Sequence, residues 1–175
     1  MAGGRAGVVA AVDVHYPVAG GARAAAVLAA DAPFSPVLDE RVTTVAHVLP
    51  YRPGEFYLRE LPPLRALLAS IARPRLVVVD GYVDLDPDGR PGLGAHVHAE
   101  FGMPVIGVAK SPFRTASHAV PVLRGDSARP LLVTAAGLRL ADAADLVSHM
   151  AGRFRVPDAL RRADALARAT APPSS

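Results

Sequence analysis

Two aspartates lie in runs that are otherwise apolar. Asp13 interrupts the run Val-Val-Ala-Ala-Val-Asp-Val, and Asp80 closes the run Leu-Val-Val-Val-Asp before a glycine. Both runs are typical of buried strands, where an unpaired carboxylate is costly. Ligand sites in open α/β sheets lie where strands end. If both strands are central, the two carboxylates converge into a site; otherwise each caps a helix or pairs with an arginine.

Two further residues could add chemistry to such a site. Glu60 lies just before a predicted helix and, taken alone, is typical of a carboxylate that favours a helix N-terminus. Lys110 ends the buried run Val-Ile-Gly-Val-Ala and is the only lysine among 19 basic residues. A lysine offers a compact point charge that arginine does not always replace. Lys110 is therefore either a phosphate ligand or an ordinary surface lysine.

The composition limits which classes of protein are open. The chain has 175 residues, of which 51% are hydrophobic and 20% charged, so it can bury a core. The lack of cysteine excludes disulfide scaffolds, thiolate zinc sites and thiol catalysis. A net charge of +3 permits a polyanionic partner without requiring one. We expect one domain over residues 1–169, a disordered tail over 170–175, no membrane span and a cytoplasmic location.

The order of the predicted elements indicates an α/β fold with a mixed sheet flanked by helices, similar to ribonuclease H. Three strands in a meander precede a helix that begins near Leu61, because Pro62 and Pro63 are tolerated only in a first turn. Crossover strands, a hairpin and helices follow. The expected strands are 7–16, 24–30, 42–49, 75–80, 104–109, 120–124 and 130–134; the expected helices are 61–72, 95–101, 140–152 and 158–169.

Four short motifs occur together in one order. The segment Pro-Tyr-Arg-Pro-Gly-Glu-Phe-Tyr-Leu-Arg-Glu at residues 50–60 resembles the Pro-Tyr-x-Pro-Gly…Arg-Glu motif of endonuclease V, the deoxyinosine 3′ endonuclease family. Val-Asp-Val-His-Tyr at 12–16, Val-Asp-Gly at 79–81 and Gly-Val-Ala-Lys-Ser at 107–111 are similar to other motifs of that family. Each motif is weak alone, but the ordered set is specific, and the resemblance covers roughly residues 7 to 168.

The resemblance implies a ribonuclease H-like fold and Mg²⁺-dependent cleavage of the second phosphodiester bond 3′ to a deaminated purine. Asp13, Glu60 and Asp80 would be metal-binding carboxylates, which suits the preference of Mg²⁺ for hard oxygen ligands; Mn²⁺ is an alternative. We expect their oxygens within about 6 Å of one another, the reach of one ion. Lys110 would reach the scissile phosphate. A C-terminal motif, Pro-x-x-x-Arg-x-Ala followed by His or Asp, makes Asp164 a fourth metal-site carboxylate.

The resemblance also implies how a base is handled. Tyr51, between two prolines that stiffen its loop, would fill the gap left by an extruded base; alternatively it is a tyrosine half-buried over the sheet. Glycines let backbone groups approach a base edge closely, which suits a chain without Asn or Gln. The expected substrate-binding residues besides Tyr51 are Gly54, Phe56, Gly81, Gly92, Leu93 and His96.

The chain departs from the family pattern after Asp80. Where the family has Asp-Gly-His-Gly, this chain has Asp80-Gly81-Tyr82-Val83. An acidic loop, Asp84 to Gly89, follows. That loop imitates the opening of a calcium loop but lacks its final glutamate, so we expect a solvated turn. Members commonly carry a helical segment before the first strand, so we expect part of the substrate-binding surface to be missing here.

The leading hypothesis is thus a monomeric DNA-repair endonuclease acting on inosine in DNA or RNA. The alternatives are a non-catalytic nucleic-acid-binding relative and a ribonuclease H-like nuclease of changed specificity.

Overall fold

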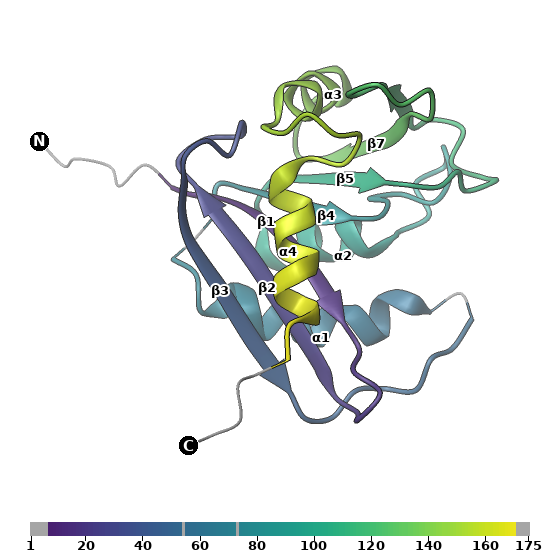
Figure 1. Ribbon diagram of the computed structural model, residues 1–175. Coiled ribbons are helices and arrows are strands. Elements are labelled where there is room, and N and C mark those ends of the chain that lie inside the picture. Colours follow the sequence, from purple (N-terminus) through teal and green to yellow (C-terminus); the bar gives the residue numbers. More distant parts are fainter. Residues whose placement is uncertain (1–6, 54, 73, 171–175) are drawn as a thin grey trace, which may run out of the picture.

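A seven-stranded mixed sheet organises the chain (Figure 1). The computed structural model describes residues 7–53, 55–72 and 74–170, so the predicted tail lies outside the described residues beyond Thr170. The strands run in the order β3-β2-β1-β4-β5-β7-β6. They are β1 (Val9–His15), β2 (Ala22–Ala29), β3 (Val37–Val45), β4 (Leu76–Asp80), β5 (Val105–Ala109), β6 (Val120–Val122) and β7 (Leu131–Ala136).

Three parallel strands form the centre of the sheet. β1 pairs in parallel with β4, and β4 pairs in parallel with β5, whereas all other neighbouring strands pair antiparallel. The β1–β2 hairpin turns at Gly20 and Gly21, which both have positive φ angles, the conformation that glycine adopts most readily. Parallel central strands must all end at the same edge of the sheet, so their last residues meet there.

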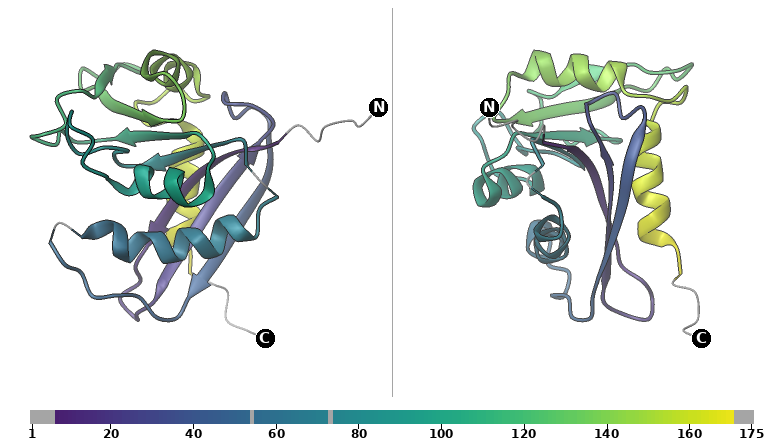
Figure 2. Two further views of the ribbon diagram at one scale, coloured as in Figure 1. Left: turned by 180° about the vertical axis from the view of Figure 1, so that it is seen from behind. Right: turned by 90° about the vertical axis from the view of Figure 1, so that its left-hand side faces the viewer.

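Helices cover both faces of this sheet (Figure 2). One face carries α1 (Phe56–Ala69) and α2 (Leu93–Phe101); the other carries α3 (Leu140–His149) and α4 (Asp158–Arg168). A hydrophobic core lies on each face of the sheet, and alternate residues of the central strands pack into one or the other. In β1, Val9 and Ala11 pack on the α3/α4 side, and Ala10 and Val12 pack on the α1/α2 side. This three-layer arrangement confirms the predicted α/β class with a helix-flanked mixed sheet.

Two elements differ from the sequence-based expectation. The third strand covers Val37–Val45 rather than 42–49, because it pairs antiparallel along the whole of β2. As an edge strand it is largely exposed, so it lacks the apolar alternation that would have fixed its start.

The first helix also begins earlier than expected, at Phe56. Pro62 and Pro63 therefore lie in its second turn, although a proline there removes a helical hydrogen bond. Burial of Leu64, Leu67 and Leu68 against the sheet offsets that loss. Consequently Glu60 lies within the helix, not before it.

No helix in the described part of the chain is long and apolar enough to cross a membrane.

Candidate active site

The ends of the three parallel strands bring two aspartates and a lysine together. The β1–β4 register pairs Val12 with Val79, so Asp13 and Asp80 are the next residues on neighbouring strands. Asp80 in turn lies opposite Val108 on β5, and Lys110 follows that strand directly. The Nζ atom of Lys110 lies 2.5 Å from Oδ2 of Asp80. The strand-end convergence predicted from the sequence is thus present.

Helices from both faces of the sheet contribute one further carboxylate each. Glu60 of α1 lines a small space of about 10 Å³ together with Asp13 and Asp80. Asp164 of α4 reaches Asp13 from the opposite face, and these two side chains share a hydrogen bond. All four acidic residues expected at the site therefore gather at one edge of the sheet.

Burial and mutual repulsion disfavour the charged forms of Asp13 and Glu60 in this cluster. Burial, reinforced by the charge of Asp80 and the contact with Asp164, raises the pKa of Asp13 to about 7. Burial, with the charges of Asp13 and Asp80, raises the pKa of Glu60 to about 8. Burial also acts to raise the pKa of Asp164, but its hydrogen bonds with Arg168 and Asp13 outweigh this and lower that pKa.

Two of the four carboxylates form ion pairs with basic side chains. Lys110 neutralises Asp80, and Nε of Arg168 lies 2.6 Å from Oδ1 of Asp164. Accordingly, within the described ranges no three His, Asp or Glu side chains are arranged to hold a metal ion. The expectation that Asp13, Glu60 and Asp80 already lie within reach of one ion is not met by these side-chain positions.

The donor set nevertheless fits a divalent cation in its chemistry. It consists of carboxylate oxygens, the ligands that Mg²⁺ and Mn²⁺ prefer. Burial and then mutual repulsion raise the pKa values of Asp13 and Glu60, and a bound cation would offset both effects. The buried hydroxyl of Tyr16, whose pKa is raised by burial and by the charge of Glu60, has no hydrogen-bond partner in the described part of the structure. Rotation of the acidic side chains away from Lys110 and Arg168 would free oxygens for an ion.

A cavity of about 360 Å³ opens beside the carboxylate cluster. Asp80 and Glu60 belong to its wall, and so do four of the predicted base-binding residues: Tyr51, Gly81, Gly92 and Leu93. Its volume falls within the range of about 300–1,000 Å³ that is usual for small-ligand sites. The structure therefore places two of the predicted catalytic residues and four of the predicted binding residues around one cavity.

Among the remaining predicted binding residues, His96 has a described side chain, and it does not line this cavity. His96 instead stacks on Tyr57, with ring centroids 3.8 Å apart, and so supports the wall from behind. Gly54 lies outside the described residues, and Phe56 is placed in α1 without a described side chain.

Gly92 shows why the wall needs glycine. A Cβ atom at this position would lie 2.7 Å from the carbonyl oxygen of Tyr82 and 2.9 Å from that of Val83. Its own N–H donates to the Val83 carbonyl at 2.7 Å. The two ends of the loop between β4 and α2 are thus held directly against each other, and a side chain at Gly92 would force them apart.

Comparison with known proteins identifies the family. The family model for Endonuclease V matches residues 3–138. The Endonuclease V of Azotobacter vinelandii is 36% identical over 183 residues, covering 92% of this chain and 82% of that relative. This chain belongs to the Endonuclease V family. Membership confirms the resemblance drawn from the four motifs, and it makes the protein a nuclease.

Solved Endonuclease V structures share the fold. The crystal structure of the enzyme from Streptomyces avermitilis is 32% identical and covers 93% of this chain and 80% of its own, with a TM-score of 0.78. Endonuclease V of Ciona intestinalis, crystallised with a 23mer DNA containing an inosine followed by a ribo-adenosine, has a TM-score of 0.77. At 21% identity, over 94% of this chain and 85% of its own, that likeness shows the fold alone.

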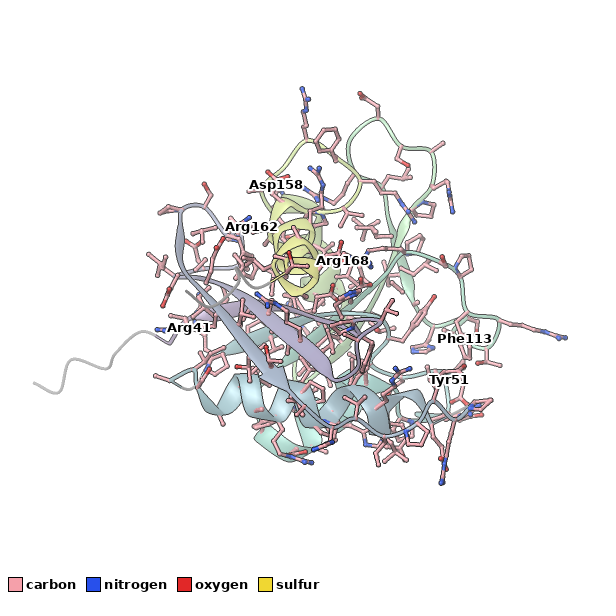
Figure 3. All side chains as sticks on the ribbon, turned by 60° about the horizontal axis from the view of Figure 1, so that its bottom comes forward. Arg41, Tyr51, Phe113, Asp158, Arg162 and Arg168 are labelled. Atoms are coloured by element: carbon pink, nitrogen blue, oxygen red, sulfur yellow. The ribbon has the colours of Figure 1, made fainter. Side chains whose placement is uncertain are left out.

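Several wall residues were missed by the sequence reasoning. Tyr57, Tyr82, Arg90 and Phe113 all line the cavity, and Figure 3 shows Phe113 on the same side of the molecule as Tyr51. Tyr82 stands where the Endonuclease V motif has histidine. Its hydroxyl donates to the Ser111 carbonyl at 2.7 Å and accepts from the Phe113 N–H at 2.9 Å. The departure from the motif is therefore a brace between the two loops that border the cavity.

The acidic loop after Tyr82 is a turn closed on itself, as expected. Oδ1 of Asp86 accepts the backbone N–H groups of Asp88 and Arg90, both at 3.0 Å. The N–H of Leu85 donates to the Arg90 carbonyl at 2.8 Å. The Asp86 oxygen is therefore used within the loop, as in other turns with Asp at the first position.

Proposed function

We propose that this protein is a Mg²⁺-dependent endonuclease that cleaves inosine-containing nucleic acid 3′ to the deaminated base. The observation that carries the proposal is the junction of four carboxylates and Lys110 with a cavity lined by aromatic residues and glycines. One part of that site suits phosphate chemistry, and the adjoining part suits a flat base. Glu60 and Asp80 belong to both parts.

The inosine substrate is supported by the family relationship. A family member with the same fold, from Ciona intestinalis, was crystallised with inosine-containing DNA. In this chain the cavity is lined by the aromatic residues Tyr57 and Phe113 and by Gly81 and Gly92, where no side chain keeps a base from the backbone. With no Asn or Gln in the chain, a base edge meets backbone groups, Arg90, tyrosine hydroxyls and the carboxylates of Glu60 and Asp80 in this cavity.

The residues divide the work as follows. Asp13, Glu60, Asp80 and Asp164 would hold the ion, which when bound supplies positive charge at the scissile phosphate and orients the attacking water. Lys110 places a point charge beside Asp80, where the phosphate must pass. Tyr51 stands at the cavity mouth, 58% exposed, on a loop stiffened by proline, and fills the space that an extruded base leaves.

We further propose that the enzyme works as a monomer in the cytoplasm and serves DNA repair. Turnover of inosine in RNA uses the same site, since a base cavity and a phosphate site do not themselves distinguish the two sugars.

A second candidate function rests on Tyr82. Because Tyr82 and Phe113 form a tilted pair with ring centroids 6.0 Å apart at the cavity wall, the base preference differs from that of family members with histidine there. In that case the enzyme cleaves strands that contain another modified base faster than strands that contain inosine.

The test is a cleavage assay on matched strands. Labelled DNA and RNA oligonucleotides carry inosine, xanthosine or guanosine at one position and are incubated with Mg²⁺, Mn²⁺ or EDTA. The proposal requires metal-dependent cleavage of the inosine strands and none of the guanosine strands. Faster cleavage of xanthosine would favour the second candidate, and cleavage in EDTA would contradict metal dependence.

A further inference from the structure

A second cavity begins on the other side of the catalytic cluster. It measures about 1,000 Å³ and shares no wall residue with the base cavity. Lys110 and Asp164 form its catalytic end. The rest of its wall consists of residues 153–156 before α4, Arg161 of α4, and Asp126 and Ser127 between β6 and β7. The carboxylate cluster therefore lies between two cavities, of which only one is needed for the base.

Phe154 is unusual within this second cavity. Its side chain is 45% exposed, although it is a large apolar ring. The guanidinium groups of Arg153 and Arg161 lie over the ring, 4.8 Å and 4.5 Å from its centroid. An exposed aromatic ring flanked by arginines is the combination with which single-stranded nucleic acids are bound, by base stacking and by phosphate contacts.

The aromatic platform, which consists of Phe154 with Arg153 and Arg161, is fixed relative to Lys110. Arg155, the residue after Phe154, donates to the Arg129 carbonyl at 2.8 Å, to the Pro130 carbonyl at 2.9 Å and to the carbonyl of Lys110 itself. From the preceding side, Arg124 donates to the Gly152 carbonyl at 2.9 Å. The loop that carries Phe154 is thus tied to the catalytic lysine's own backbone, so a bound strand would be held in register with the site.

We propose that this cavity binds the part of the strand that lies beyond the cleaved bond. The guanidinium groups of Arg153 and Arg161 would turn from the ring of Phe154 onto phosphates, and a base would stack on the ring in their place. The proposal rests on the proposed function. If the modified base occupies the first cavity and the cut falls on its 3′ side, the strand crosses Asp80 and Lys110. Its 3′ flank then enters the second cavity, where the wall includes four basic residues, Lys110, Arg153, Arg155 and Arg161, against the two acids Asp126 and Asp164.

The experiment varies the length of the 3′ flank in the substrate and the side chain of Phe154 in the protein. Single-turnover cleavage is measured at rising protein concentration on two inosine DNA strands, one ending just beyond the cut and one with a long 3′ flank. Phe154→Ala should raise the half-saturating concentration for the long strand about tenfold, or about 1.4 kcal/mol. For the short strand, Phe154→Ala should change the half-saturating concentration less than about twofold. The maximal cleavage rate should stay unchanged. Phe154→Trp should retain wild-type behaviour, because it keeps a ring for stacking.

Arginine variants test the phosphate contacts. Arg153→Ala should reduce the salt dependence of binding the long strand by about 0.7 in the slope of log affinity against log salt, the value of one single-strand phosphate contact. Arg41→Ala is the matched control, since Arg41 is an exposed arginine on β3 beyond either cavity. It should leave both strands unchanged.

The outcomes separate this inference from the proposed function. If wild-type protein cleaves no inosine strand, the proposed function fails and this inference fails with it. If wild-type protein cleaves but Phe154→Ala affects both strands equally, or neither, only the strand-binding role of this cavity is overturned. If Phe154→Trp weakens binding of the long strand as Phe154→Ala does, and also lowers the unfolding temperature, then Phe154 serves folding. That result would also overturn the inference.

Discussion

The ammonium group of Lys110 lies 2.5 Å from a carboxylate oxygen of Asp80, across the ends of the neighbouring parallel strands β5 and β4. Lys110 is the only lysine in the chain. Both side chains are partly exposed, so the pair contributes little to stability. Its position at the meeting point of the two cavities points instead to a role in holding charge where a phosphate must bind.

Replacement of Lys110 tests that role. Lys110→Met should lower the single-turnover cleavage rate about 100-fold or more, because one preorganised charge at the reacting phosphate is lost. Lys110→Arg should recover part of the rate, since arginine keeps the charge but not the compact shape of the ammonium group. A Lys110→Met variant that cleaves at the wild-type rate would remove this residue from the active site.

Replacement of Asp80 separates chemistry from binding. Asp80→Asn should abolish cleavage, because a carboxamide keeps the shape but loses the negative charge that holds a divalent ion. Binding of an inosine strand should stay near normal, as it rests on phosphate contacts from arginines and Lys110. Cleavage and strand binding by the variant are measured side by side. Wild-type cleavage in Mg²⁺ would show that Asp80 is not a ligand.

Tyr51 should matter mainly in duplexes. Extruding a base costs a few kcal/mol, and an aromatic ring that fills the gap returns roughly 1–3 kcal/mol. Tyr51→Ala should therefore slow cleavage of duplex inosine about tenfold or more, with a much smaller effect on single strands. The comparison needs cleavage rates of both proteins on both substrates. Equal losses would mean that Tyr51 only supports packing.

Tyr82 should act through the loop that it braces. Tyr82→Phe removes the hydrogen bonds to Ser111 and Phe113 and leaves the ring in place. Each such bond is worth about 0.5–1.5 kcal/mol, so the loss of both should raise the half-saturating concentration of inosine strands about fivefold or more. Tyr57→Phe, a hydroxyl removed from another wall tyrosine, serves as the control. An identical response of the two variants would argue against the brace.

Thr134 should stabilise the loop after β4, which carries Tyr82 and Val83, from within the core. It is 1% exposed on β7, and its hydroxyl accepts the buried N–H of Val83 at 2.8 Å. Thr134→Val keeps the volume but leaves that N–H without a partner, so the free energy of unfolding should fall by about 1–3 kcal/mol. Denaturant unfolding measures this loss. Thr134→Ser keeps the hydroxyl and should lose less; an unchanged Thr134→Val variant would contradict the assignment.

The sequence predicted the parts of the site that depend on strand ends. Asp13 and Asp80 stood out because each is a charge in an apolar strand, and parallel neighbours must end together. Glu60 was recognised through its motif, but its place within α1 was not, because Pro62 and Pro63 misplaced the start of the helix. Propensity counts against prolines in a second turn, and only the packing of α1 on the sheet shows why they are tolerated.

The wall of the base cavity was harder to foresee. Tyr82 and Phe113 are 31 positions apart, and they meet because the loops after β4 and β5 leave the same edge of the sheet. Tyr82 was noticed only as a departure from a motif, with no indication of its partner. In the same way, Phe154 gave no sequence signal, since its platform arises from arginines on a loop and on α4.

The central claim is that the base cavity and the carboxylate cluster act as one site with a fixed offset. Mapping the cut at single-nucleotide resolution, on an end-labelled strand with one inosine, tests this most directly. A single Mg²⁺-dependent cut at the second phosphodiester bond on the 3′ side of inosine is the predicted result. Cuts scattered along the strand, or cuts that ignore the position of inosine, would contradict the account.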